Sequence, residues 1–488
     1  MSRGDHRPVE SFYHLWDVPI GSQACQGTAC FAARHLNPQR WSGAVSGGQR
    51  IYCLGKCYMA PAAATEDSRP LMEVHAPRAV VLERLAEGGA RPLAAYSAGG
   101  GYGALELTLR RPPAETIRDV EVSRLRGRGG AGFPTGRKWR AVFDQPADEK
   151  FLVANADEGD PGAYIDRFIL EEDPHCLIEA MAIAGFAVGA RRGYIYLRKE
   201  YPTAQTVLLE ALSEARQGGI LGDRVLGHPY SFDIQLVMGQ GSYVCGEETA
   251  LLNSIEGKRP EVRTRPPYPA QAGLFGRPTL VNNVETLANI PWIVRHGAEA
   301  YAALGFSNSR GTKVVSLNSL FRRPGLYEVE FGVPLRHIVE TLGGGLRTGA
   351  ITGVMIGGPL AGLLPPEHFE TPFGFEELRA VGAAVGHGGI IAFDEHTSIP
   401  ELVQHVFRFG AYESCGKCTP CRAGSREVER MFERVLGSRQ VAREERGAWE
   451  DTVAALRWTS LCGHGTGLAE FAESLMRHYR EEITACFA

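Results

Sequence analysis

The sequence predicts a multidomain protein of mixed α/β and α+β class. Short β-rich segments alternate with helical ones between residues 150 and 295, a stretch rich in Val, Ile and Gly spans 312–395, and a helical pattern runs from Ile399 onward. At about 150 residues a domain, the 488 residues suffice for three or four domains. We place them at residues 1–97, 98–311, 312–395 and 396–488.

The first of these domains carries two cysteine pairs, with C-x4-C and C-x3-C spacing. The second pair follows a β-like segment, and an apolar stripe predicts a helix over residues 76–87. Two such pairs in a small αβ module suit a [2Fe–2S] cluster; the alternative is a degenerate domain whose thiols bind no metal. The candidate ligands are Cys25, Cys30, Cys53 and Cys57.

The second domain follows a glycine-rich segment, residues 97–103, whose composition predicts a flexible linker. Beyond an amphipathic stretch at 116–125, strands alternate with helices, which predicts an α/β core. We expect strands at 151–155, 193–197 and 234–238, and helices at 176–188 and 204–216. Residues 312–395, with a Pro324-Gly325 turn, predict a small mixed β domain.

A run of glycines from Gly127 to Gly132, followed by Phe133 and Lys138, has the composition of a phosphate-binding loop. Glycines let backbone N–H groups approach a pyrophosphate, and Lys138 adds a positive charge. The run matches neither a Walker loop nor a good Rossmann fingerprint, because the βαβ spacing and the acidic ribose partner are not evident. A structural glycine turn is the alternative.

Two further segments place acidic and amide groups at the ends of predicted elements. Residues 155–160, Asn-Ala-Asp-Glu-Gly-Asp, follow a strand and suit a ribityl chain or a flavin ring, or else a helix cap and turn. Residues 245–249, Cys-Gly-Glu-Glu-Thr, open a helix whose N–H groups can bind an anion. The paired carboxylates could instead complement the helix dipole.

Two shorter motifs complete the candidate nucleotide site. Residues 265–268, Arg-Pro-Pro-Tyr, present a cation and an aromatic face on a rigid turn, which suits phosphate pairing and adenine stacking, or simple packing. Residues 281–286, Val-Asn-Asn-Val-Glu-Thr, place two amides at a predicted helix start. None of these motifs is decisive by itself.

The most informative motif is a triple of cysteines, Cys415, Cys418 and Cys421, with a fourth at Cys462. Two overlapping C-x2-C steps put three thiolates on one loop, and a distant loop supplies the fourth, which is the ligand pattern of a [4Fe–4S] cluster. Zinc is the competing interpretation, although zinc sites more often use two separated C-x2-C pairs.

Composition narrows the possible functions. The chain is 44% hydrophobic and 22% charged with a net charge of −4, as in ordinary soluble proteins, so nothing points to nucleic acid or an anionic membrane. The longest apolar stretch, 180–190, is too short to span a bilayer, and residues 1–7 lack a signal-peptide core. Grouped cysteines without an export signal predict metal ligands in a reducing, cytoplasmic setting, with no direct membrane insertion.

Taken in order, these segments resemble the NADH-binding flavoprotein subunit of respiratory complex I and its relatives in NAD-linked hydrogenases and formate dehydrogenases, over about 70% of the chain. The resemblance implies FMN, NAD(H) and one [4Fe–4S] cluster. It implies a Rossmann-like FMN/NADH domain, a ubiquitin-like β-grasp domain and a C-terminal helical iron–sulfur bundle. The N-terminal cysteine pairs resemble a thioredoxin-like [2Fe–2S] domain, here fused.

The same resemblance implies a set of residues for each cofactor. For FMN these are Gly127, Gly129, Gly130, Lys138, Asn155, Asp157, Glu158, Gly246, Glu247, Asn282, Asn283 and Thr286. For NAD(H) they are Phe133, Glu248, Arg265 and Tyr268, with Asp160 standing where complex I usually has Glu. Hydride passes between nicotinamide and FMN, so no side chain need be an acid or base, and Glu247 and Glu248 would position the cofactors.

The stretches 356–365 and 381–390 most resemble the β subunit of molybdenum- or tungsten-dependent formate dehydrogenases. They imply a diaphorase subunit of an NAD-dependent formate dehydrogenase, whose partners are a large catalytic subunit with further iron–sulfur clusters and a small ferredoxin-like subunit. One alternative is the same module in a bidirectional hydrogenase or complex I. Another is a zinc-stapled nucleotide-binding scaffold without redox activity.

Overall fold

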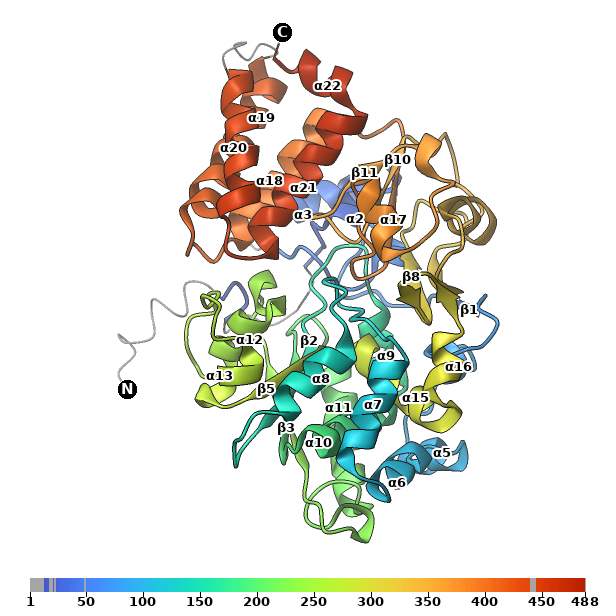
Figure 1. Ribbon diagram of the computed structural model, residues 1–488. Helices are drawn as coiled ribbons and strands as arrows, with labels where there is room; N and C mark the ends of the chain where they lie inside the picture. Colours follow the sequence, from blue (N-terminus) through green and yellow to red (C-terminus); the bar gives the residue numbers. More distant parts are fainter. Residues whose placement is uncertain (1–12, 17–20, 22, 48–49, 439–444, 488) are drawn as a thin grey trace.

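The computed structural model describes residues 13–16, 21, 23–47, 50–438 and 445–487 (Figure 1). Residues 1–7, where the sequence predicts no export signal, lie outside this part. The described chain is built around a parallel sheet, a mixed sheet and a C-terminal group of helices. These elements confirm the predicted mixture of α/β core, β-rich region and helical C-terminus.

The parallel sheet has the strand order β4-β3-β2-β5, and every neighbouring pair is parallel. Its strands are β2 (Phe151–Ala156), β3 (Arg192–Leu197), β4 (Asp233–Met238) and β5 (Thr279–Asn283). Helices α10 (Pro174–Val188) and α11 (Pro202–Gln217) connect them. Three strands and both helices were predicted; β5 was not, because its five residues lead directly into α14 (Val284–Ala288).

The mixed sheet has six strands in the order β1-β9-β8-β12-β10-β11. Its strands are β1 (Leu71–Val74), β8 (Thr312–Leu317), β9 (Gly325–Glu330), β10 (Gly353–Ile356), β11 (Leu363–Leu364) and β12 (Gly389–Phe393). Strand β1 pairs in parallel with β9, from Leu71 opposite Gly325 to Val74 opposite Glu328. A segment that the sequence assigned to the first domain therefore completes the sheet of the third.

The N-terminal region differs from the expected thioredoxin-like domain. Within the described part of residues 13–70 the regular elements are short helices, α2 (Thr28–Ala32), α3 (Pro38–Ser46), η1 (Arg34–Leu36) and η2 (Cys57–Met59), and the β-structure there is one bridge between Ala24 and Ala63. The buried apolar side chains of this region, such as Phe31 and Leu54, belong to the same core cluster as those of the rest of the chain, so the region packs onto it. The helix predicted over 76–87 is reduced to α4 (Leu82–Leu85).

The glycine-rich segment 97–103 is not a flexible linker, contrary to its composition. It joins α5 (Leu93–Ala98) to α6 (Gly103–Leu109), and the side chains of Tyr96 and Tyr102 are buried. The Tyr102 hydroxyl and His175 Nδ1 are hydrogen-bonded at 2.6 Å. A Cβ added to Gly101 would lie 2.1 Å from the Tyr96 ring, so glycine here permits close packing.

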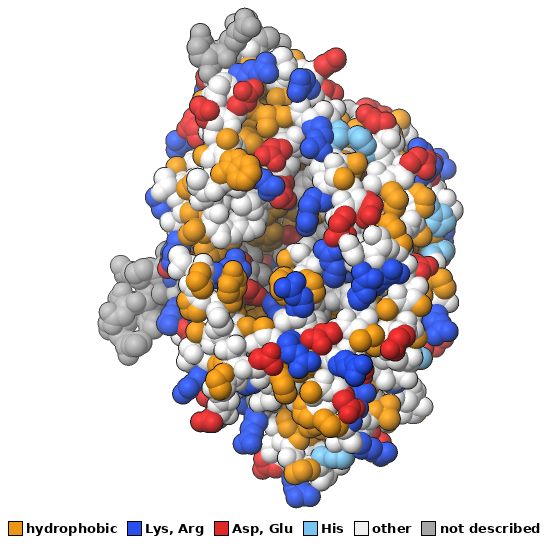
Figure 2. Space-filling view, viewed as in Figure 1, with side chains coloured by type: hydrophobic (Ala, Val, Ile, Leu, Met, Phe, Trp, Pro, Cys, Tyr) orange, Lys and Arg blue, Asp and Glu red, His pale blue; other side chains and the backbone are white. Residues whose placement is uncertain are grey.

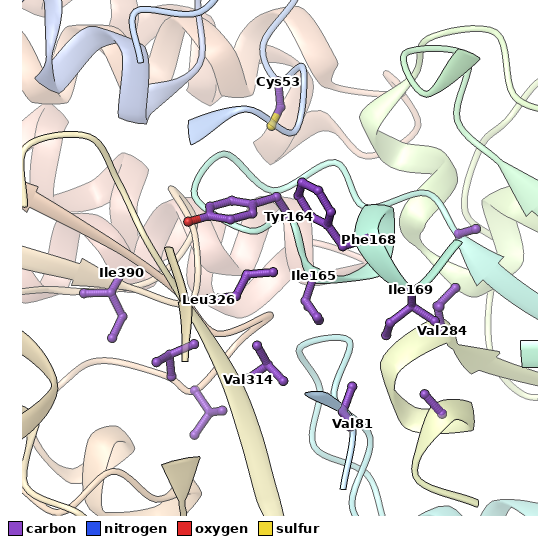
Figure 3. Close-up of a cluster of buried hydrophobic side chains, with 14 of the residues drawn as sticks. Cys53, Val81, Tyr164, Ile165, Phe168, Ile169, Val284, Val314, Leu326 and Ile390 are labelled. Atoms are coloured by element: carbon purple, nitrogen blue, oxygen red, sulfur yellow. The ribbon is translucent and has the colours of Figure 1, made fainter. Parts of the chain in front are cut away.

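One core joins these regions (Figure 3). Tyr164, with Ile165 and Phe168 on α9 (Ile165–Glu172), lies between Cys53 of the N-terminal region and the mixed-sheet residue Leu326. All of these side chains are buried. Truncating a residue such as Leu326 to alanine would cost about 2–5 kcal/mol, so the relative placement of the regions is set by packing and not by linkers.

The C-terminal helices, red in Figure 1, lie beside β11 of the mixed sheet, and the end of α18 is tied to Tyr243. They are α18 (Ile399–Glu413), α19 (Ser425–Ser438), α20 (Glu445–Thr459), α21 (Gly463–His478) and α22 (Arg480–Ala485), with the short η8 (Pro420–Gly424) before α19. Helix α18 starts at a capping box in which the Ser398 amide donates to Glu401 Oε2 at 3.2 Å. Among the described residues, no helix combines the length and apolarity needed to cross a bilayer.

Candidate cofactor sites

The predicted nucleotide segments converge at the carboxyl edge of the parallel sheet. Asn155, at the end of β2, donates through Nδ2 to the Gly246 carbonyl at 2.8 Å, which ties the Cys-Gly-Glu-Glu segment to the strand end. Asn283, at the end of β5, lies under the glycine loop, where a Cβ added to Gly129 would be 2.7 Å from the Asn283 Cβ. Thr286 Oγ1 accepts from the Arg128 amide at 2.8 Å. Segments far apart in sequence thus form one loop cluster.

Two buried polar atoms in this cluster find no hydrogen-bond partner among the described residues, Asp157 Oδ2 and Ser242 Oγ. Both residues line a small cavity shared with Tyr243 and Arg198. Burial raises the pKa of Asp157 well above its usual value. Buried polar atoms without a partner at this edge of the sheet fit a ligand that carries hydroxyls, and FMN carries them.

Other predicted residues already have structural partners. Asn282 Oδ1 accepts from Trp139 Nε1 at 2.9 Å. Glu158 is 1% exposed and accepts from the amides of Asp166 and Arg167, each at 3.1 Å, which caps α9. Burial, followed by the Asp166 charge, raises the pKa of Glu158 to about 8. In this structure Asn282 and Glu158 therefore bind neighbouring protein groups and support the site residues around them.

A charged cluster forms the mouth of the site. Lys138 Nζ donates to Glu248 Oε2 at 2.7 Å, and Arg265 Nη1 lies 3.4 Å from Glu248 Oε1. Burial alone would raise the pKa of Glu248, but Lys138 and Arg265 outweigh it and lower the pKa, so this carboxylate is ionised. Glu247 Oε2 accepts from two amides at 2.9 Å at the start of α12 (Glu248–Ile255), the capping role that the sequence left open.

Two predicted aromatic residues are exposed. Phe133 is 50% and Tyr268 54% exposed, although large apolar side chains are usually covered. Phe133 belongs to the glycine loop, and Tyr268 stands three residues after Arg265. The molecule is hollowed on the face shown in Figure 2, below the C-terminal helices, with Lys and Arg side chains along its lower edge. Exposed rings beside cations suit a planar, anionic ligand.

The four C-terminal cysteines converge where helices α18, η8 and α21 meet. Cys415 follows α18, Cys421 lies in η8 and Cys462 precedes α21. A hydrogen bond to the Cys421 thiol and burial raise the pKa of Cys418, and burial raises that of Cys462 to about 11. The first amides of α21 point at the Cys462 sulfur. Four neighbouring thiols with amide donors fit a cluster that takes them as thiolates.

The four N-terminal cysteines also come together, although 22 residues separate the two pairs. All four side chains are buried. The thiols of Cys25 and Cys30, and those of Cys53 and Cys57, are hydrogen-bonded, which with burial raises the pKa of Cys30 and of Cys57.

Each of these sulfurs accepts from one backbone amide. The donors are Gly27 to Cys25 at 3.3 Å, Ala62 to Cys30 at 3.4 Å, Gly55 to Cys53 at 3.3 Å and Gly162 to Cys57 at 3.2 Å. Hydrogen bonds to the sulfurs are among the interactions by which proteins tune iron–sulfur clusters.

Sequence reasoning missed several residues of this region. Tyr243, whose hydroxyl donates to Asp160 Oδ1, and Arg198, which donates to the Cys53 carbonyl at 2.8 Å, were not predicted as site residues. Asp166 and His387 were missed as well. His387 lies within the stretch 381–390, and a histidine between glycines is the signal that could have singled it out.

Two family models match the chain. Residues 120–292 match the Nuo51 FMN-binding domain, and residues 401–486 match the NADH-ubiquinone oxidoreductase-F iron–sulfur binding region. These ranges contain the loop cluster and the four C-terminal cysteines, respectively. The match over residues 401–486 favours an iron–sulfur cluster over zinc at Cys415, Cys418, Cys421 and Cys462, a choice that the geometry alone does not make.

The chain is also similar to whole proteins. It is 42% identical over 391 residues to the NADP-reducing hydrogenase subunit HndC of Solidesulfovibrio fructosivorans, covering 80% of this chain and 79% of that one. It is 41% identical over 398 residues to an NADH-quinone oxidoreductase subunit of Rhizobium meliloti (strain 1021), covering 80% and 94%. A crystal structure of NAD+-reducing [NiFe]-hydrogenase in the H2-reduced state superposes with a TM-score of 0.83 at 30% identity, covering 100% of this chain and 88% of that one.

Proposed function

This chain belongs to the family of NADH-binding, FMN- and iron–sulfur-containing flavoprotein subunits of complex I-like and hydrogenase complexes, and we propose that it is the diaphorase subunit of an NAD-linked hydrogenase. As a family member it binds FMN, NADH and a [4Fe–4S] cluster, and it works beside other iron–sulfur subunits. The observation that favours a hydrogenase is the likeness to the NAD+-reducing [NiFe]-hydrogenase chain, which covers this chain throughout, N-terminal region included.

Bound FMN would supply the conversion between two-electron hydride chemistry with NADH and one-electron transfer. The glycine loop and Lys138 would hold the FMN phosphate, because backbone amides of a glycine loop and an ammonium group both bind phosphate. Asp157 would accept from a ribityl hydroxyl through its orphaned Oδ2. Arg265 would pair with the NADH pyrophosphate and Tyr268 would stack on its adenine. The other residues predicted for the site would orient the two cofactors through their carbonyl, amide and carboxylate groups.

The loop cluster and the C-terminal cysteines share a wall, which supports transfer of electrons between them. The Tyr243 amide donates to Glu413 Oε2 at 3.0 Å, which ties residues 243–247 to the end of α18. Val244 and Ala250 pack in one apolar cluster with Cys415. Residues 243–250 thus contact the surroundings of the C-terminal cysteines while belonging to the loop cluster. In the proposed function, this segment would lie between the flavin and the [4Fe–4S] cluster.

The N-terminal cysteines would hold a [2Fe–2S] cluster, because four buried sulfurs meet and each accepts an amide hydrogen bond. Cys30→Ser in the full chain should lower iron and acid-labile sulfide by about two each per chain, the content of that cluster type. Cys176→Ser, a buried thiol outside both groups, is the control. Unchanged iron and sulfide in Cys30→Ser would leave the N-terminal thiols without a metal role.

The proposed function is tested by isolating the native complex and identifying its large subunit. We expect nickel and NADH-dependent reduction of a viologen dye. A large subunit with molybdopterin or tungstopterin would instead support the formate dehydrogenase that the stretches 356–365 and 381–390 suggested. A colourless, zinc-containing preparation that NADH does not bleach would overturn the redox assignment altogether.

A further inference from the structure

A loop of the mixed-sheet region reaches the proposed flavin site. Gly386, just before β12, forms an isolated antiparallel bridge with Gly130 of the glycine loop. His387 follows it and is 9% exposed. The stretch 381–390, to which the sequence assigned no site residue, therefore brings one ionisable side chain to the loop cluster from a different sheet.

His387 lies between two aspartates. Its Nδ1 is 3.3 Å from Asp160 Oδ2, and its Nε2 is 3.6 Å from Asp166 Oδ2 and 3.2 Å from Asn283 Nδ2. Asn283 Nδ2 also donates to Asp166 Oδ2 at 2.5 Å, so the amide and the imidazole share one carboxylate oxygen. His387 thus borders residues from the ends of both β2 and β5.

Each aspartate also binds a neighbouring element. Asp160 Oδ1 accepts from the Tyr243 hydroxyl, and Asp166 Oδ1 accepts from the Glu285 amide at 3.0 Å. Without a cation between them, two carboxylates in this buried space would repel each other and disturb those bonds. Burial lowers the pKa of His387, but the hydrogen bonds and charges of Asp160 and Asp166 outweigh it and raise the pKa well above its usual value. The imidazole is therefore a cation at neutral pH.

We propose that His387 is a positioning residue of the flavin site: as the buried cation between Asp160 and Asp166, it fixes the 157–162 loop through Asp160 and Asn283 through the shared Asp166 carboxylate, and its charge raises the reduction potential of FMN bound there. The inference rests on the proposed FMN contacts of Gly130 and Asn283. A positive charge near a flavin favours the electron-rich form, since reduction adds negative charge to the ring. Removing the charge of His387 should therefore lower the reduction potential of FMN.

The test replaces His387 in the full chain in two ways. His387→Gln keeps hydrogen bonding and removes the charge, whereas His387→Lys keeps the charge. His396→Gln, a half-exposed histidine in the same region, is the matched control. FMN affinity is measured by reconstitution of the stripped protein, and the FMN potential by anaerobic spectroelectrochemical titration.

We expect His387→Gln to weaken FMN binding about tenfold, the scale of one hydrogen bond to a charged group, and to lower the FMN potential. His387→Lys should restore the potential toward that of the unaltered protein, and His396→Gln should change neither. An unchanged potential in His387→Gln, or equal shifts in the Gln and Lys variants, overturns the proposal.

Asn283→Ala separates this proposal from the site on which it rests. If Asn283→Ala loses FMN while His387→Gln keeps the potential, the flavin site stands and only the role of His387 fails. If Asn283→Ala binds FMN as tightly as the unaltered protein, the assignment of Asn283 to the flavin fails, and the proposal fails with it.

Discussion

Replacing Tyr268 by alanine should weaken adenine-nucleotide binding and leave FMN in place. The ring is 54% exposed, so it is available to a ligand, and its loss removes little packing from the fold. The backbone role of the residue survives, because its amide donates to Gln271 Oε1 at 3.1 Å whatever the side chain. Stacking of a base on an aromatic ring contributes about 1–3 kcal/mol, so Kd should rise about 5- to 150-fold.

The measurement is a calorimetric titration of the FMN-loaded full chain with ADP-ribose, which carries the adenine and cannot reduce the flavin. Tyr268→Phe keeps the ring and should bind as the unaltered protein does. Phe275→Ala removes another aromatic ring that is 56% exposed, and it should not affect the Kd. A Kd for Tyr268→Ala within twofold of the unaltered value would refute the stacking role.

Three further outcomes follow from the structure. Cys418→Ser should abolish the low-temperature EPR signal of the NADH-reduced [4Fe–4S] cluster while FMN stays bound, whereas Cys486→Ser, another thiol of the C-terminal helices, should leave the signal intact. Lys313→Met should cost about 3–5 kcal/mol in the free energy of unfolding measured with urea, because it strands the fully buried Glu285 carboxylate, and adding Glu285→Gln should recover most of the loss. Because the pKa of Glu158 is raised to about 8, the folded chain keeps a proton that the unfolded chain releases near pH 4.5. Stability should therefore fall as pH rises from about 4.5 to 8, by at most about 1.4 kcal/mol per pH unit from this group, and Glu158→Gln should remove that slope in denaturation at pH 5, 6.5 and 8.

Sequence periodicity predicted the elements whose burial is regular. Strand β2 and helix α10 are covered on nearly all sides, so their apolar runs are continuous and bounded by turns. Strand β1 could not be predicted from periodicity, because its four residues are stabilised by pairing with β9, about 250 positions later in the chain. The prediction of a flexible linker at 97–103 was wrong for a related reason. A high glycine content is found both in mobile segments and in segments that pass close to a buried ring such as Tyr96.

The candidate site likewise contains features that local sequence predicts and features that depend on distant contacts. Cysteine spacing predicted both thiol groups, because ligand spacing is a local property of the chain. The charged pairs of the proposed flavin site are not local: Asp166 and His387 are 221 positions apart and meet because α9 packs against the mixed sheet. Glu247 illustrates a third case: its carboxylate caps a helix, and its Oε1 also lies 3.9 Å from Arg265 Nη2. The capping role and the binding-site role raised by the sequence therefore do not exclude each other.

The loop 157–162 explains how the N-terminal region can offer a cluster site without a sheet of its own. The Gly162 amide donates to Cys57 Sγ, and the Asp160 carbonyl lies 4.0 Å from Cys53 Sγ, so the flavin-side loop completes the surroundings of the N-terminal thiols. Arg198, at the end of β3, adds a buried cation that helps lower the pKa of Cys53 to about 6, after the hydrogen bond from Cys57. A fragment of residues 1–97 would lack all three of these groups. Its failure to bind iron would therefore say nothing about the full chain, where the loop 157–162 borders both the proposed FMN site and the N-terminal cysteines.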